Sequence, residues 1–272
     1  MSNHQVVIYM GTMGWSYKDW LGVFYPQESN QKDYLTYYSQ VFNSLEIDST
    51  FYYIPKPEVV TTWHQNTPSE FRFSAKLPKI ITHDRGLVDV EDILTPFLSN
   101  MALLGEKIAC YLVQLSPGYR CNETTFTRFK HFLDLLPVED FRFAIEFRHQ
   151  SWIKPSVFDL LRNKNVAWTI QDHPWEMPMV PEITANFTYI RWKGDSSDTR
   201  TSHVKEAVID RTQKVIKWAG VLKKDLIPKV NTVFGYFSNH YSGHAPTNCN
   251  QMKKLMGLDT KSPNFGQQMS LF

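Results

Sequence analysis

The segment FRFAIEFRH, residues 141–149, indicates the fold most clearly, because apolar and polar side chains alternate in it and it ends in charged residues. With the two-residue period of a β-strand, one face is wholly apolar and the other mostly polar: Phe141, Phe143, Ile145 and Phe147 against Arg142, Ala144, Glu146 and Arg148. Helical patterns flank the segment, which favours a βαβ setting. In a closed barrel the second face is buried, so its charges need partners.

Strand-like runs alternate with helical patterns along the rest of the chain. Strands are expected at residues 6–10, 44–48, 71–77, 108–115, 141–147, 167–172, 187–193 and 232–238. Helices are expected at residues 31–42, 58–65, 90–104, 124–136, 155–163 and 204–222. This order predicts an α/β protein: a single (β/α)8 TIM-type barrel over residues 1–258, followed by a short flexible C-terminal tail over residues 259–272.

The composition indicates a folded cytoplasmic protein. Of 272 residues, 42% are hydrophobic and 14% aromatic, which is enough for one large core. The net charge of +2 is too small to indicate nucleic-acid binding by itself. Three cysteines in no metal-like spacing favour a reducing compartment, and no apolar run approaches membrane-spanning length. We therefore expect a cytoplasmic location and no membrane partner.

Six motifs resemble those of the YecE-like family. They are GTMGWSYKDWLGVFYP (residues 11–26), LEIDSTFY (45–52), FRFSAKLPKIITH (71–83), EFRHQSW (146–152), YIRWKG (189–194) and SNHYSGHAPTNC (238–249), which together span nearly the whole chain. The resemblance implies a TIM-type barrel but supplies no function, because the family is a domain of unknown function. Lys193 stands where the family often has His, Ser238 where it often has Asn, and QLSP (114–117) where Gln-Phe-Pro-Pro is usual. Chemistry that needs that His or Asn is therefore not implied here.

These motifs fall at the carboxyl ends of the expected strands, where barrels hold their active sites. Period-two counting places ten polar side chains in or above this mouth: Glu46, Asp48, Lys76, Gln114, Glu146, Arg148, Asp172, Arg191, Lys193 and Asn239. Four acids thus face four bases. A structural salt-bridge network explains any single member equally well, but a barrel interior normally uses Val, Ile and Leu, and burying many ions is costly. As a set, the charges indicate a site for a small polar or anionic ligand.

Aromatic and histidine residues of the same motifs complete the predicted ligand site: Trp15, Tyr17, His83, His149 and Trp152. Taken singly, each aromatic residue is better explained by core packing. Together with acids and bases they suit a sugar-like or nucleotide-like substrate, whose faces stack while its edges form hydrogen bonds.

The sequence leaves metal binding undecided. Glu146, His149, Asp172 and His173 could approach one another from neighbouring strands. However, no tight motif such as His-Glu-x-x-His occurs, and hydrogen-bonding loop histidines are the favoured explanation. Neither a Gly-rich dinucleotide fingerprint nor a phosphate-loop motif is present, so no cofactor is predicted, while a divalent metal stays open.

Two functions of different class are compatible with this mouth. In the first, the chain is an enzyme, a hydrolase or a lyase, in which Glu46 or Glu146 is the general acid or base. Lys76 belongs to the catalytic set because it can hold or stabilise an anionic or carbonyl-bearing substrate, together with Arg148 and Arg191. In the second, a non-catalytic ligand-binding or scaffold protein uses the same pocket. Substrate turnover distinguishes the two, and the sequence does not name the substrate.

The chain ends in QMSLF, residues 268–272, after a polar, turn-rich segment. A frayed terminus, or a patch docked on its own barrel, explains this ending equally well. Alternatively, QMSLF resembles the Gln-Leu-Ser/Asp-Leu-Phe pentapeptide through which many bacterial DNA-associated proteins bind the DNA sliding clamp. That resemblance implies that Gln268 forms hydrogen bonds while Met269, Leu271 and Phe272 fill an apolar groove. It would connect the barrel to DNA processing.

Overall fold

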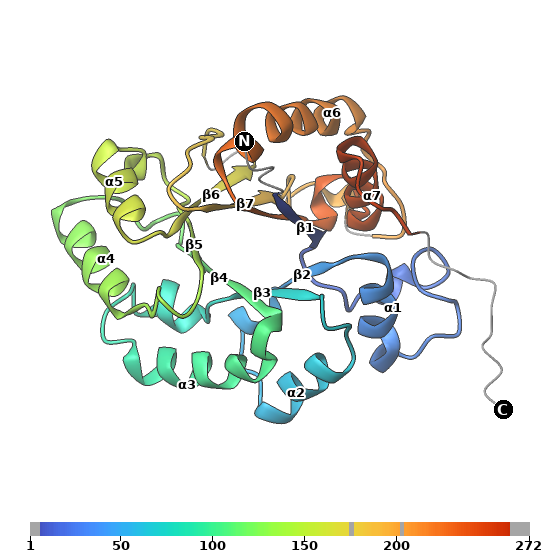
Figure 1. Cartoon of the computed structure of the whole chain (residues 1–272), viewed down its shortest axis with the longest axis horizontal. Helices are drawn as coiled ribbons and strands as arrows, with labels where there is room; N and C mark the ends of the chain where they lie inside the picture. The colour runs from blue at the N-terminus through green and yellow to red at the C-terminus, as the bar shows by residue number, and fades with distance from the viewer. Residues whose placement is uncertain (1–5, 174–176, 202–203, 262–272) are drawn as a thin grey trace.

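The chain forms a barrel of parallel strands surrounded by helices (Figure 1). The computed structural model describes residues 6–173, 177–201 and 204–261. The strands are β1 Val7–Thr12, β2 Ser44–Ile47, β3 Arg72–Lys76, β4 Ile108–Gln114, β5 Phe143–Glu146, β6 Ala167–Asp172, β7 Phe187–Trp192 and β8 Thr232–Phe237. Their order is β1-β8-β7-β6-β5-β4-β3-β2, so each strand lies beside its sequence neighbours and β8 pairs with β1. The predicted TIM-type barrel is confirmed.

The seam between β1 and β2 is closed mainly by side chains. One parallel bridge joins Met13 to Glu46 beyond the end of β1. Nearer the start of the strands, Asn43 accepts a hydrogen bond from the backbone N of Met10 at 3.0 Å. The Tyr38 hydroxyl accepts from the backbone N of Thr12 at 2.8 Å. The barrel is therefore nearly closed, and these contacts hold β2, which carries Glu46, beside β1.

Helices follow most strands and cover the outside of the barrel (Figure 1). They are α1 Tyr34–Val41, α2 Pro57–Gln65, α3 Glu91–Met101, α4 Glu123–Leu135, α5 Pro155–Asn163, α6 Thr212–Val221 and α7 Ala245–Met256. Within the residues that the structure describes, the connection from β6 to β7 contains no helix. The helix expected at residues 90–104 ends earlier, at Met101, because the next residues, Ala102–Lys107, form a 3-10 helix.

One prediction about the last helices is wrong, and one helix was not predicted. The helix expected at residues 204–222 begins only at Thr212, because Val208 and Ile209 donate their backbone N–H groups to Ser242 O and Asp210 accepts from the backbone N of Thr212 at 2.8 Å. Helix α7 was not among the expected helices. Its buried residues are small or polar rather than large and aliphatic: Ala245, Pro246, Asn248, Cys249, Met252 and Lys253. This composition gives a weak apolar periodicity.

The apolar residues form two layers, as the alternation in β5 predicts. Phe143, Ile145 and Phe147 are at most 1% exposed and belong to the large core between strands and helices. Burial of each stabilises the fold by roughly 1.5 to 3 kcal/mol. Ala144 belongs instead to the smaller core inside the barrel, which also contains Phe187. Since β5 keeps this alternation to its end, Glu146 must enter the barrel interior.

No helix within residues 6–173, 177–201 and 204–261 is long and apolar enough to cross a bilayer. The final helix ends at Gly257, which adopts the left-handed conformation (φ 71°) that closes many helices. Residues 268–272, which carry the clamp-like motif, lie outside the described residues.

Candidate functional site

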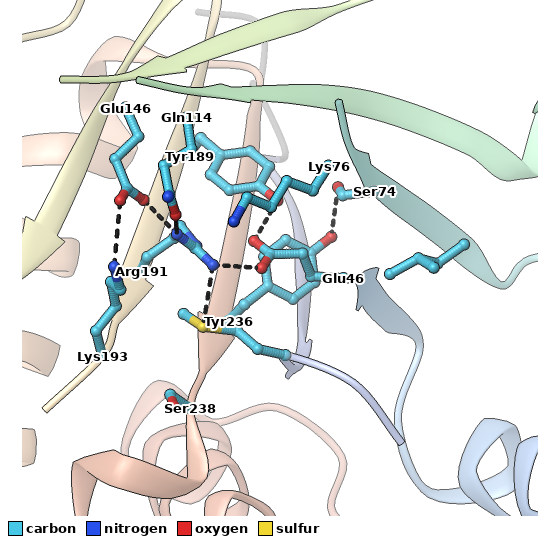
Figure 2. Close-up of polar contacts among 12 residues, drawn as sticks. Glu46, Ser74, Lys76, Gln114, Glu146, Tyr189, Arg191, Lys193, Tyr236 and Ser238 are labelled. Atoms are coloured by element: carbon cyan, nitrogen blue, oxygen red, sulfur yellow. Dashed lines mark hydrogen bonds and ion pairs between the residues drawn. The ribbon is translucent and has the colours of Figure 1, made fainter. Parts of the chain in front are cut away.

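Arg191 lies at the centre of a polar cluster at the carboxyl ends of the strands (Figure 2). It comes from β7 and is only 4% exposed. Its Nη2 donates to Glu46 Oε1 at 2.7 Å, and its Nη1 donates to Gln114 Oε1 at 3.0 Å and to Glu146 Oε2. Burial alone would lower the pKa of Arg191, but the carboxylates of Glu146 and Glu46 outweigh burial and raise that pKa. The guanidinium therefore stays charged and fixes two carboxylates from different strands.

Glu146 is the most heavily engaged carboxylate of the cluster. Besides Arg191, it accepts a hydrogen bond from Lys193 Nζ at 3.3 Å, and Arg148 Nε lies 4.0 Å from its Oε1. Burial by itself would raise the pKa of Glu146, but the three cations hold that pKa well below its usual range. Glu146 is therefore ionised at neutral pH. It can act as a fixed negative charge, but it is not a proton donor there.

Lys76 ends β3 and enters the cluster beside Phe51. It is 8% exposed, and its Nζ lies 3.6 Å from the centroid of the Phe51 ring. Burial is the main cause that lowers the pKa of Lys76 to about 7, and the charge of Arg191 adds to it, against the opposing effect of Glu146 and Glu46. Glu46, Lys76, Gln114, Glu146, Arg148, Arg191 and Lys193 together are the barrel-end cluster.

Tyr17 and Asp48 lie at the rim beside the barrel-end cluster. The Tyr17 hydroxyl donates to the backbone O of Met13 at 3.0 Å, and burial followed by the charge of Asp48 raises its pKa. Burial, and then the charge of Glu46, raises the pKa of Asp48. Gly14 (φ 74°) allows this packing, since a Cβ there would lie 2.9 Å from the Tyr17 hydroxyl and 3.2 Å from Asp48 Oδ1. Asp48 can thus retain a proton at higher pH than an exposed carboxyl.

Two further predicted ligand residues, His83 and Asn239, follow β3 and β8 respectively. Asn239 Oδ1 accepts from the backbone N of Ala245 at 3.0 Å. The His83 ring lies 5.0 Å from the Phe51 ring. Burial, and then the charge of Lys76, lowers the pKa of His83 to about 4, so its imidazole is neutral at physiological pH.

Asp172 does not face the mouth, and the prediction that it does is wrong. Its carboxylate has three partners on outer elements: Lys214 Nζ at 2.5 Å, Trp218 Nε1 at 2.7 Å and the Tyr241 hydroxyl at 3.3 Å. Because Ala167 of β6 lies in the inner core, period-two counting along the strand turns Gln171 inward and Asp172 outward. Asp172 therefore anchors α6 and contributes no charge to the ligand site.

Two of the predicted aromatic ligand residues pack within the protein instead. Trp152 is fully buried, stacks on Phe147 at 4.7 Å between ring centroids, and donates its Nε1 hydrogen to the backbone O of Tyr119 at 2.7 Å. Trp15 packs edge-on against Trp63 of α2 at 5.8 Å. The structure therefore gives these two side chains a packing role and does not bring them to the barrel-end cluster.

The sequence reasoning missed two tyrosines inside the barrel below the cluster. The Tyr189 hydroxyl donates to Glu46 Oε2 at 2.7 Å. The Tyr236 hydroxyl lies 2.7 Å from Ser44 Oγ and 2.8 Å from Ser74 Oγ. Tyr189 comes two residues before the central arginine on β7, so the same period-two counting could have found it. Of the two hydroxyls, that of Tyr189 contacts the barrel-end cluster directly, and that of Tyr236 contacts Ser74 (Figure 2).

A metal site has little support in the described part of the chain, where no three His, Cys, Asp or Glu side chains are grouped to hold an ion. His149 Nδ1 accepts a hydrogen bond from the backbone N of Ser151 at 3.2 Å, so it caps the turn Gln150–Trp152. Glu146 is already bound by cations, and Asp172 points outward. The side chains that could have formed a site with His173 are therefore engaged elsewhere.

The barrel-end cluster combines a rigid part with a titratable part. Glu46 and Glu146 are each fully buried and fixed by Arg191. Lys76 has a pKa of about 7, and burial lowers the pKa of Lys193 to about 8, although Glu146 opposes this change. Two amines can thus exchange protons near neutral pH beside a fixed frame of opposite charges.

The matching protein family carries the description "Protein of unknown function DUF72", and its model covers residues 9–270. The UPF0759 protein YecE of Escherichia coli K12 is 37% identical in an alignment of 238 residues, with 78% of this chain and 82% of that protein covered. The UPF0759 protein YunF of Bacillus subtilis 168 is 27% identical over 284 residues, with 93% of this chain and 96% of that protein covered.

Two solved structures of DUF72 family proteins have the same fold. The protein from Thermotoga maritima MSB8 has a TM-score of 0.75 at 23% identity, with 92% of this chain and 99% of that chain covered. The protein from Enterococcus faecalis V583 has a TM-score of 0.75 at 24% identity, with 96% and 99% covered. At such identities the likeness extends to the fold alone.

Proposed function

Because this chain belongs to the DUF72 family, whose description assigns no function, we propose its function from the barrel-end cluster: an enzyme for acid/base chemistry on a small anionic substrate. The observation that carries the proposal is the position of Lys76, a buried amine beside two carboxylates that Arg191 already holds. The Lys76 pKa of about 7 leaves comparable amounts of ammonium and amine at neutral pH, which is the condition for efficient proton transfer. A lysine kept only for structure gains nothing from this state.

The buried carboxylates have a different part in this proposal. Glu146 is held ionised by Arg191, Lys193 and Arg148, so it orients cations rather than donating protons. Glu46 accepts from both Arg191 and Tyr189, which fixes its two oxygens. We therefore assign to Lys76 the acid/base role that the sequence predicted for these carboxylates. Glu46 and Glu146 instead supply fixed negative charges that orient the cations.

An anionic substrate is favoured by the balance of charge inside the barrel. Two fully buried carboxylates, Glu46 and Glu146, share the barrel-end cluster with four cations: Lys76, Arg148, Arg191 and Lys193. Burial is the main cause that lowers the pKa of Lys76 and of Lys193, and repulsion from Arg191 adds to it. A carboxylate or phosphate group would relieve that repulsion. The low exposure of the cluster favours a small ligand.

The test begins with binding and continues with turnover. Thermal melting in the presence of phosphate, small carboxylates, sugar phosphates and nucleotides identifies an anion that stabilises the protein. At 100 times its Kd such a ligand adds about 2.7 kcal/mol, or roughly 5 to 10 °C in Tm. The Lys193→Met variant should lose this gain. Turnover of the bound compound, followed by NMR and abolished by Lys76→Met, supports an enzyme. Binding without turnover by any bound compound would favour the ligand-binding or scaffold protein.

The C-terminal tail supports a second, separate proposal. We propose that residues 268–272 bind a bacterial sliding clamp, with Gln268 as the hydrogen-bonding residue and Met269, Leu271 and Phe272 as the apolar anchors. The support is the QMSLF sequence, together with the position of Lys261, an exposed residue beyond α7 from which the tail continues. Burial of Leu271 and Phe272 contributes roughly 1.5 to 3 kcal/mol each, so a micromolar complex is the strongest expected.

A further inference from the structure

Lys76 differs from the other cations of the barrel-end cluster in its contacts. Arg191 holds both buried carboxylates, and Lys193 donates to Glu146. Among the described residues, Lys76 Nζ has neither a hydrogen bond nor a salt bridge, and it lies over the face of the Phe51 ring, 3.6 Å from its centroid. Figure 2 shows the amine directed into the space between Glu46 and Arg191. Its nitrogen is therefore not held by a polar partner within the described part of the chain.

The backbone around Lys76 is held in place, so the amine is presented in a defined position. Lys76 O accepts a hydrogen bond from Thr50 Oγ1 at 2.6 Å. The next residue, Leu77, donates its backbone N–H to Leu112 O at 2.9 Å. Lys76 itself is paired with Leu112 of β4 in the sheet register. Such pre-positioning lowers the entropic cost of attack on a bound carbonyl.

The amine is also unusually nucleophilic for a lysine. Burial, and then the charge of Arg191, lowers the pKa of Lys76 to about 7, so about half of the molecules carry a neutral amine at pH 7. A surface lysine with a pKa near 10.4 is neutral in only about 0.04% of molecules at that pH. The neutral form that can attack a carbonyl is therefore far more populated at Lys76 than at a surface lysine.

We infer that Lys76 Nζ forms an imine with the carbonyl carbon of a small anionic aldehyde or keto compound, an inference that rests on the proposed function and names its substrate class. The nitrogen lone pair forms a bond to the carbonyl carbon, and the carbonyl oxygen takes up a proton. The nitrogen then loses its protons, a second proton reaches the oxygen, and water leaves. One amine and one carbonyl thus give one imine and one water, without oxidation or reduction.

Neighbouring groups suit the two further requirements of this reaction. The departing oxygen needs a proton, and Asp48, whose pKa is raised by burial and by Glu46, lies within electrostatic range of Lys76. The anionic group of the substrate needs a counter-charge, which Lys193 supplies across the cluster. Arg191 and Tyr189 already form hydrogen bonds with the two carboxylate oxygens of Glu46. Glu46 therefore competes less strongly with a substrate for the Lys76 amine.

Borohydride trapping tests the inference. The protein is incubated at pH 7 with sodium pyruvate or sodium glyoxylate, reduced with sodium borohydride, digested and mapped by mass spectrometry. We expect one adduct per chain, located on Lys76 and formed at least a hundred times faster than on any other lysine. The Lys76→Arg variant, which keeps the charge, should lose this adduct. The Lys79→Arg variant, altered at a half-exposed lysine three residues away, should retain it.

The outcomes separate this inference from the proposed function. Adducts spread over surface lysines at similar rates in the wild-type protein overturn the imine, whether or not the variants fold. An adduct that persists in Lys76→Arg, or in Lys76→Met if the arginine variant fails to fold, does the same. If trapping fails while an anion still raises Tm and is turned over, the proposed enzyme stands and only the imine is lost. If no anion binds, the proposed function fails.

Discussion

Replacement of Lys76 by Met should make the protein more stable at neutral pH, although it removes a residue of the proposed site. Lys76 is 8% exposed, and its pKa of about 7 in the folded chain lies well below the value of about 10.4 expected when unfolded. Its folded pKa is depressed, so the native state holds the charged form at a cost. Methionine has a similar length and carries no charge, which removes that cost.

The size of the effect follows from the pKa difference. Each pKa unit corresponds to about 1.4 kcal/mol, so the buried amine costs roughly 4 kcal/mol at pH 7. The variant also loses the cation–π contact with Phe51, which costs about 1 kcal/mol. The free energy of unfolding of Lys76→Met should therefore exceed that of wild type by about 3 kcal/mol at pH 7. Between pH 7 and 10.4 the unfolded chain binds more protons than the native state, so wild-type stability rises with pH. The gain should therefore approach zero at about pH 10.

Urea unfolding at pH 7 and pH 10, followed by tryptophan fluorescence, measures this difference. The matched control is Lys79→Met, because Lys79 is half exposed and pairs with Asp84 at 3.0 Å on the surface. That variant should change stability by less than about 1 kcal/mol at either pH. A Lys76→Met variant less stable than wild type at pH 7 would refute the reasoning. It would mean that Lys76 is an essential counter-charge for the carboxylates.

Three further predictions concern other parts of the molecule. Glu146→Gln should cost about 3 to 5 kcal/mol in urea unfolding at pH 7, because three cations lose their shared counter-charge, and a cost below about 1 kcal/mol would contradict the geometry. Since the folded pKa of Glu146 is depressed, its contribution is present above about pH 4.3 and is lost as pH falls further, so the variant and wild type should converge in acid melting curves. Asp172→Asn should lower Tm by weakening the contact with Lys214 of α6, yet leave anion binding at the mouth unchanged, and a loss of binding would return Asp172 to the site. A fluorescent peptide of residues 263–272 should bind purified bacterial clamp with micromolar Kd, while a peptide with Leu271 and Phe272 changed to Ala should not, and equal binding by both would remove the clamp as a partner.

The sequence alone determined the barrel and the main part of its polar end. The alternation in residues 141–147 is a local property of a strand, so it specified that Glu146 faces inward before any contact was known. The same counting on β2, β3 and β7 placed Glu46, Lys76 and Arg191 at one end, because parallel strands of a barrel end together. The motif resemblance to the YecE-like family is likewise confirmed, because the family model matches residues 9–270 and the YecE protein is 37% identical.

Tertiary structure decided which of these residues share a site and which are in a reactive state. Asp172 points outward because packing on both faces of β6 decides which of its residues face the barrel interior. Its partners, Lys214 and Trp218, come from a helix 42 and 46 residues away in the sequence. Trp152 entered the core because Phe147 and Tyr119 surround it, a long-range choice that no local pattern contains. The low pKa of Lys76 likewise depends on burial and on the allocation of carboxylates to other cations. Such competition for partners exists only after the strands have closed into a barrel, because the competing groups are distant in the sequence.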